Sequence, residues 1–187
     1  MATGVDDIIC LGDIISTDRE RSDHCVIMLE ARNVLCVFGN HDSVLMETAK
    51  GAPENNIVSL NTLGYLEHLP LRLERGKLLF THISPLYDAK QLRSSDNDDA
   101  RDLMPYLIGS KYKVLFVGHT HQPEIIDSSG STFIPEVRKP VQLKASAKYI
   151  INPGAVDMMK PLQKQTISYG IFDTITGIYT AMDAYGR

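Results

Sequence analysis

Short apolar runs alternate with amphipathic segments along the first part of the chain. Residues 8–11 and 34–38 are continuous apolar runs, a pattern typical of strands buried on both faces of a sheet. Between these runs, Ser22 or Asp23 is placed to cap a helix whose apolar positions fall at helical spacing within residues 25–29. The pattern therefore predicts a strand, a helix and a second strand.

The rest of the chain adds further elements of both kinds. They are a hairpin (71–73 with 78–80), a helix near 101–107, a strand at 114–117 and antiparallel strands at 149–151, 167–172 and 178–182. No internal repeat, linker or low-complexity tract interrupts this order. We therefore expect a single α/β domain over residues 1–187.

Composition and charge narrow the classes of function. The 187 residues are 43% hydrophobic and 22% charged, as in an ordinary globular protein, and the net charge is −4. This charge argues against a broad nucleic-acid surface or a surface for anionic membranes. The chain shows no transmembrane run and no signal-peptide pattern, and its three cysteines lack the spacing of a disulfide framework or a metal site. We expect buried reduced thiols and a cytoplasmic protein.

Four of the apolar runs end close to a side chain that can bind a metal ion: Asp13, Asn40, His82 and His119. Ligands of open α/β sheets gather outside the carboxyl ends of the strands, so these side chains are expected to converge. Each residue alone has an ordinary interpretation as a turn, cap or core residue, and only the joint pattern favours a metal site. Carboxylate, amide oxygen and imidazole together suit Mn, Fe, Co or Zn. His121 lies two residues after His119 and can share its pocket.

Four motifs resemble successive blocks of the calcineurin-like metallophosphoesterase superfamily, in the same order. They are Gly12-Asp13, Gly39-Asn40-His41-Asp42, Thr81-His82 and Gly118-His119-Thr120-His121. A later motif, Asn152-Pro153-Gly154-Ala155, resembles a turn of the small bacterial and archaeal phosphodiesterases of this superfamily. The resemblance implies a two-sheet α-β-β-α sandwich. It also implies hydrolysis of a small phosphomonoester or phosphodiester by metal-activated water.

The resemblance assigns a metal-binding role to five residues. Asp13 would bridge two metal ions, and His121 would bind the first of them. Asn40, His82 and His119 would complete the ligands of the second ion. Manganese is the expected metal, with Fe, Zn, Co and Ni as alternatives.

The resemblance also assigns two residues to the reaction itself. His41 would face the substrate, where it would donate a hydrogen bond to a phosphate oxygen or protonate the leaving group. Asp42 would orient the ring of His41. An adjacent carboxylate favours the protonated form of imidazole near neutral pH, which fits both tasks.

The chain departs from the family pattern at its beginning. The family opens with an Asp-x-His block on a first strand, and no such block precedes Asp13. We therefore expect the first strand and helix to be missing, one well-formed metal site, and a weak first site that keeps Asp13 and His121. Self-association could cover the missing strand, so a homo-oligomer is considered. The alternative function is a non-catalytic metal-binding scaffold for protein interactions.

Overall fold

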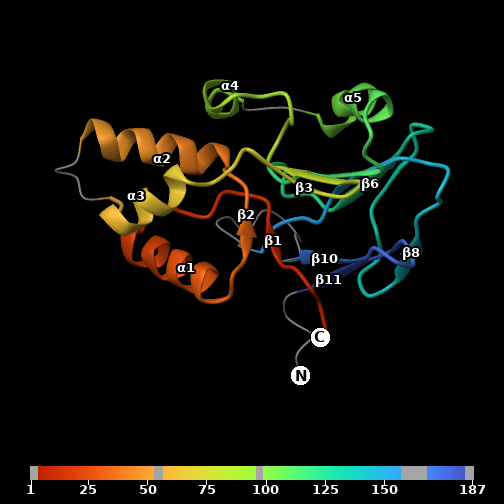
Figure 1. The fold of residues 1–187 in the computed structure, drawn as a ribbon, viewed down its shortest axis with the longest axis horizontal. Helices are drawn as coiled ribbons and strands as arrows, with labels where there is room; N and C mark the ends of the chain where they lie inside the picture. Colours follow the sequence, from red (N-terminus) through yellow and green to blue (C-terminus); the bar gives the residue numbers. More distant parts are fainter. Residues whose placement is uncertain (1–3, 53–56, 96–98, 157–167, 184–187) are drawn as a thin grey trace. The chain divides into compact units, whose positions relative to one another are not determined.

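The structure, a computed structural model, describes residues 4–52, 57–95, 99–156 and 168–183 (Figure 1). The chain divides into two compact units, and each unit consists of two separate segments of the sequence. The first unit comprises residues 1–73 and 80–97, and the second comprises residues 74–79 and 98–187. The single-domain organisation expected for residues 1–187 stays a prediction. Within the described residues, no helix is both long enough and apolar enough to cross a membrane.

The first unit combines helices with one pair of short strands. Its elements are β1 (Ile9–Cys10), α1 (Arg19–Ala31), β2 (Leu35–Cys36), α2 (Asn40–Gly51), α3 (Leu60–Glu67) and α4 (Ala89–Arg93). Strands β1 and β2 fall inside the predicted apolar runs and pair in parallel, with Cys10 opposite Cys36. The buried core of this unit includes Val26 of α1, Leu66 of α3 and Leu92 of α4. This core holds the helices of the unit together.

Helix α1 begins earlier than the sequence predicted. Its N-cap is Asp18, whose carboxylate accepts a backbone N–H three residues later, and the predicted caps both lie inside the helix. The Ser22 hydroxyl donates to the carbonyl oxygen of Asp18 at 2.8 Å. The Asp23 carboxylate accepts hydrogen bonds from the hydroxyls of Ser59 and Thr62, both at 2.6 Å. The predicted cap was therefore wrong, and Asp23 instead ties α1 to the start of α3.

The second unit is built on two sheets, and the β3–β4 hairpin lies at the boundary between the units. The larger sheet has the order β3 (Arg72–Arg75), β4 (Leu78–Thr81), β5 (Val114–Phe116), β9 (Tyr149–Asn152), β6 (Glu124–Asp127), β7 (Thr132–Phe133). The smaller, antiparallel sheet has the order β10 (Ser168–Asp173), β11 (Ile178–Asp183), β8 (Pro140–Gln142). The 3₁₀ helix η2 (Ala100–Leu103) leads directly into α5 (Met104–Gly109).

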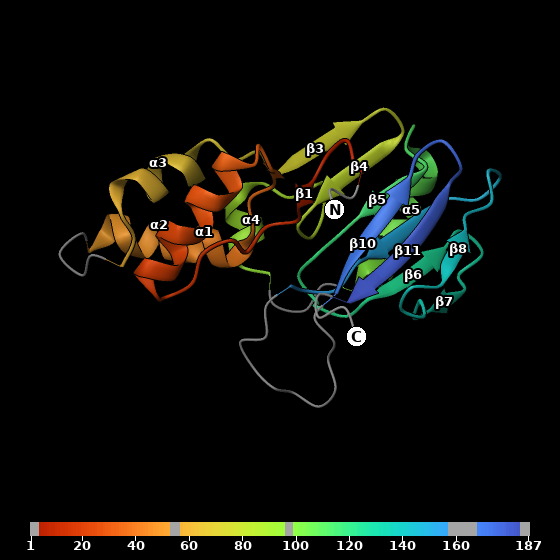
Figure 2. The same cartoon turned by 90° about the horizontal axis from the view of Figure 1, so that it is seen from below.

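The larger sheet is covered on both faces. On one face, Leu115 of β5 and Ile150 of β9 share a buried cluster with Leu107 of α5. On the other face, Phe116 of β5 meets Phe172 of β10, with ring centroids 5.8 Å apart. Figure 2 shows β10 and β11 as a layer beside β5 and β6. The predicted α/β class, with sheet packed on sheet and helix outside, is confirmed.

The direction of one strand differs from the prediction. The last third was expected to be antiparallel, and the β10–β11 hairpin is. Strand β9, however, runs parallel to β5 and antiparallel to β6. Its residues Ile150 and Ile151 are both fully buried. A continuous apolar run indicates burial on both faces of a strand but not the direction of the neighbouring strands. The sequence could therefore not distinguish parallel from antiparallel pairing of β9.

The buried side chain of Tyr179 in β11 offers a test of this packing. Among the described residues, its hydroxyl has no hydrogen-bond partner. Replacing it with phenylalanine (Tyr179→Phe) removes a desolvated polar group and loses no bond. We expect the free energy of unfolding to rise by about 1 kcal/mol, measured by denaturant titration.

Tyr149 of β9 is the matched control. Its hydroxyl accepts the backbone N–H of Lys144 at 2.9 Å. Tyr149→Phe leaves that N–H without its partner, so we expect the free energy of unfolding to fall by about 1 kcal/mol. Equal destabilisation by the two substitutions would show that the Tyr179 hydroxyl is hydrogen-bonded after all.

Candidate functional site

The turn that follows β1 brings three segments of the first unit into close contact. Gly12 and Asp13 have positive φ angles of 96° and 58°, so the chain bends sharply before the first candidate ligand. A Cβ atom at Gly12 would lie 2.9 Å from the backbone of Gly39 and 2.9 Å from Nδ1 of His82. Only glycine permits both this backbone conformation and this approach.

Asp42 holds this turn in place through its buried carboxylate. Oδ1 accepts the backbone N–H groups of Ile14 at 2.8 Å and Ile15 at 3.0 Å, and Oδ2 accepts those of Asp13 at 2.9 Å and Gly39 at 3.0 Å. Burial raises the pKa of Asp42 above its ordinary value, while the backbone donors oppose that rise. The carboxylate thus fixes the backbone on which Asp13 sits.

These bonds correct the role predicted for Asp42. It was expected to orient the ring of His41, but its two oxygens instead receive four backbone N–H groups. Helix α2 begins at Asn40, a start that was not predicted from the sequence pattern. One signal was present, because a carboxylate three residues after Gly39 is a common partner for the N–H group at a helix start. Asp42 is therefore a positioning residue for Asp13.

Three acceptor atoms converge on one point beside this turn. Nδ1 of the buried His82 ring lies 2.6 Å from the carbonyl oxygen of Leu11, and a carbonyl only accepts, so Nδ1 donates. The other ring nitrogen, Nε2, lies 2.8 Å from Oδ1 of Asn40 and 3.3 Å from Oδ2 of Asp13. In a neutral ring Nε2 carries a lone pair, so the three lone pairs face one another. A cation, either a proton or a metal ion, is needed among them.

The pKa values of His82 and Asp13 are shifted in opposite directions. Burial acts to lower the pKa of His82, but the Asp13 carboxylate outweighs burial and the pKa lies above its ordinary value. Burial acts to raise the pKa of Asp13, and the hydrogen bond from His82 outweighs it, so this pKa lies below its ordinary value. The two shifts have opposite directions because each group stabilises the charged form of the other.

His41 lies at the start of α2, next to Asn40. Its backbone N–H donates to Oδ1 of Asp13 at 2.9 Å, and the residue is exposed. The N-terminus of a helix carries partial positive charge, which stabilises the Asp13 carboxylate and favours an anion nearby. The structure therefore places an exposed imidazole at an end of a helix that suits a phosphate group.

His119 and His121 occupy a strained bend after β5, in the second unit. Their φ angles are 64° and 59°, values that residues other than glycine adopt infrequently. The fully buried Asn152 holds this bend, because its amide donates to the carbonyl oxygen of Gly118 at 2.7 Å and to Oγ1 of Thr120 at 2.9 Å. Asn152 is a positioning residue that the motif identified without showing its role.

The predicted site residues thus form two groups. Asp13, Asn40 and His82 converge in the first unit, with His41 and Asp42 beside them, while both histidines of the bend after β5 belong to the second unit. Across the described ranges, no cluster of three or more His, Cys, Asp or Glu side chains is arranged to hold a metal ion. The group in the first unit contains two such side chains and an asparagine.

Comparisons with known proteins agree with this fold and these motifs. Residues 1–177 match the calcineurin-like phosphoesterase superfamily domain. The crystal structure of a metallophosphoesterase from Sphaerobacter thermophilus is similar, with a TM-score of 0.77 and 28% sequence identity over 100% of this chain and 80% of that one. A protein from Pyrococcus horikoshii OT3 has a TM-score of 0.61 and 13% identity over 96% of this chain and 75% of that one. No curated protein matches.

The chain therefore belongs to the calcineurin-like phosphoesterase superfamily. That family is one of hydrolases that act on phosphoesters, as the motifs implied.

The four bonds of Asp42 allow a direct test of its positioning role. In Asp42→Asn, an amide N–H₂ group would face backbone donors that a carboxylate oxygen now accepts. We expect the free energy of unfolding to fall by about 3 kcal/mol, since buried donors lose their partner. Denaturant unfolding measures the change.

Asp18→Asn is the matched control, because asparagine caps a helix about as well as aspartate. It should change the free energy of unfolding by less than about 0.5 kcal/mol. If Asp42→Asn were equally mild, the four-bond clamp would not be formed in solution.

Proposed function

We propose that the protein hydrolyses phosphomonoesters or phosphodiesters with divalent metal ions held by Asp13, Asn40, His82, His119 and His121. The observation that carries this proposal is the convergence of His82 Nε2 with the side-chain oxygens of Asn40 and Asp13. Metal ions bind where lone pairs of this kind meet. Membership of the superfamily supplies the class of reaction, and the substrate is expected to be a small phosphorylated molecule.

The residues present fit a divalent first-row metal. The bond from His82 Nδ1 to the Leu11 carbonyl selects the tautomer whose Nε2 carries the lone pair that a metal ion would accept, a common arrangement in such sites. Carboxylate, amide oxygen and imidazole favour manganese, with Fe, Zn, Co and Ni as alternatives. We propose one well-formed metal site with Asp13, Asn40 and His82 of the first unit among its ligands. His119 and His121 of the second unit keep the metal-ligand roles that the resemblance implies, His121 for a second ion.

Bound divalent cations lower the pKa of a water molecule and neutralise charge on the phosphoryl oxygens. The chain's own groups perform the remaining tasks. The N-terminus of α2 attracts the phosphate, and the exposed His41 ring next to it can hold a proton for the oxygen that leaves. Asp42 keeps the backbone of Asp13 in place.

The activity is tested with manganese and bis-p-nitrophenyl phosphate or p-nitrophenyl phosphate as substrates. We expect turnover with the unaltered chain and a loss of at least about 100-fold in His119→Ala, since even groups behind metal ligands contribute 10- to 100-fold. His24→Ala is the matched control, because His24 is exposed on α1 and belongs to no candidate site. It should keep full activity.

Turnover that survives His119→Ala would contradict the assigned metal site. Absence of turnover in the unaltered chain, with every common divalent metal, would contradict the enzyme and support the non-catalytic scaffold.

Metal removal offers a second test that does not depend on turnover. Ligands that bind only the folded state stabilise it by about 2.7 kcal/mol at a concentration 100 times the dissociation constant. We expect manganese to raise the melting temperature of the chelator-treated protein, and this rise to disappear in His82→Gln. Equal stabilisation of both proteins would place the metal elsewhere.

A further inference from the structure

Two cysteines of the first unit lie opposite each other on neighbouring strands. Cys10 of β1 and Cys36 of β2 are paired in the parallel register, so their side chains share one face of the strand pair. The Cys10 thiol donates to the carbonyl oxygen of Gly12, and the Cys36 thiol donates to that of Val34. Neighbouring strands lie about 4.8 Å apart, which falls within the range of Cα separations that disulfides span. The backbone register thus places the two cysteines where a disulfide between them is geometrically accessible.

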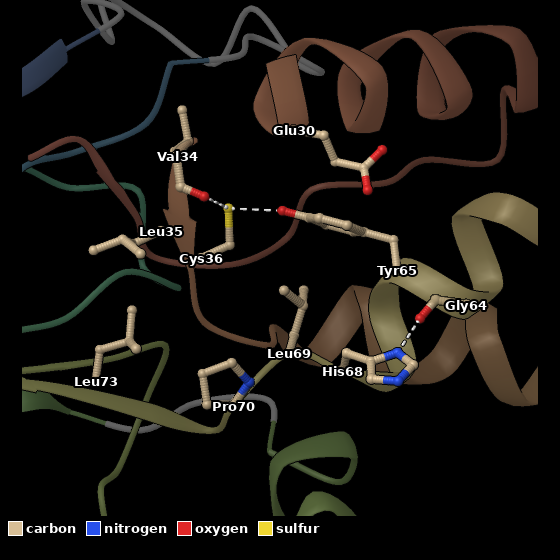
Figure 3. A pocket seen from close by; sticks show the side chains of 10 residues that line it. All are labelled: Glu30, Val34, Leu35, Cys36, Gly64, Tyr65, His68, Leu69, Pro70 and Leu73. Carbon is tan, nitrogen blue, oxygen red and sulfur yellow. Dashed lines mark hydrogen bonds between the residues drawn. The ribbon is translucent and has the colours of Figure 1, made fainter. Parts of the chain in front are cut away.

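A pocket in the same unit leads to one of these sulfur atoms (Figure 3). It has a volume of about 450 Å³ and is lined by Cys36, Tyr65 and mostly apolar side chains that include Leu35 and Leu69. Cys36 is otherwise buried, so the pocket is its route to small molecules. A mostly apolar lining of this kind admits a small uncharged molecule more readily than an ion.

Tyr65 prepares Cys36 for reaction. Its hydroxyl donates to Sγ of Cys36 at 3.2 Å, as Figure 3 shows. Hydrogen bonds from Cys10 and Tyr65 lower the pKa of the Cys36 thiol against the opposing effect of burial. The hydrogen bond with Cys36 and burial raise the pKa of Cys10. Because the pocket reaches Cys36 and Tyr65 donates to its sulfur atom, Cys36 is the thiol that acts as the nucleophile, and Cys10 is its partner.

We propose that Cys10 and Cys36 form a peroxide-sensitive dithiol that is oxidised to an intramolecular disulfide. The Cys36 thiolate attacks one oxygen of hydrogen peroxide, the O–O bond breaks, and the leaving hydroxide takes a proton to become water. The resulting sulfenic acid is attacked by the sulfur of Cys10, the S–O bond breaks, and a second water leaves. Two thiols lose two electrons in total, and one peroxide gains them.

The disulfide is expected to be easily reduced. The strand spacing lies near the short end of the Cα range for disulfides, and the Cβ atoms of a disulfide must approach to about 3.8 Å, so we expect the bond to draw the two side chains together. Strain of this kind makes a disulfide more reducible, as reversible redox sites require. Strands of two residues each, as β1 and β2 are, can yield to the pull without loss of a large sheet.

The proposal is tested by exposing the full chain to hydrogen peroxide, blocking the remaining thiols with N-ethylmaleimide and digesting with trypsin. Cleavage after arginine and lysine puts the three cysteines in separate peptides, residues 1–19, 22–32 and 33–50. We expect the first and third peptides to become joined, two hydrogen atoms lighter than their sum. Cys25 in the second peptide should stay blocked by the reagent, and dithiothreitol should reverse the link.

Two variants test the order of the steps. In Cys10→Ser, Cys36 should stop at the sulfenic acid, which dimedone traps. In Tyr65→Phe, the link should form about tenfold more slowly, because the nucleophile loses a hydrogen bond to its charged form. Cys10 and Cys36 that both remain blocked at a peroxide dose that oxidises Cys25 would overturn the proposal. So would a disulfide that joins two chains.

Discussion

The carboxylate of Asp42 accepts four backbone N–H groups from two stretches of chain that are far apart in sequence. Burying a charge in this way costs several kcal/mol unless its oxygens are fully hydrogen-bonded, and here both oxygens are. The turn after β1, the start of α2 and the position of Asp13 all follow from this one cluster of bonds. Loss of the charge would release all three together.

In the second unit, a buried neutral side chain holds the backbone in place through hydrogen bonds, as the Asp42 carboxylate does in the first. The amide of Asn152 holds the bend that carries His119 and His121, and the bend has a backbone conformation that needs such support. In both units a buried polar group fixes the backbone that carries candidate ligands.

Much of this arrangement could be predicted from the sequence. Each of Asp13, Asn40 and His82 follows an apolar run. In the structure, Nε2 of His82 lies 2.8 Å from Oδ1 of Asn40 and 3.3 Å from Oδ2 of Asp13. Of the bonds of Asp42, only the local one to Gly39 could be predicted, because its partners Ile14 and Ile15 are far away in sequence. The direction of β9 relative to β5 and β6 could not be predicted either, because it depends on which strands pair with it in the folded sheet.

The proposed function depends on a cation that binds among His82 Nε2, Asn40 Oδ1 and Asp13 Oδ2. Anomalous scattering from crystals grown with manganese tests this most directly. We predict a manganese peak in bonding contact with all three atoms, with the bond from His82 Nδ1 to Leu11 retained. Crystals grown with saturating manganese that show no peak there, and His82 Nε2 still in contact with Asn40, would contradict the account.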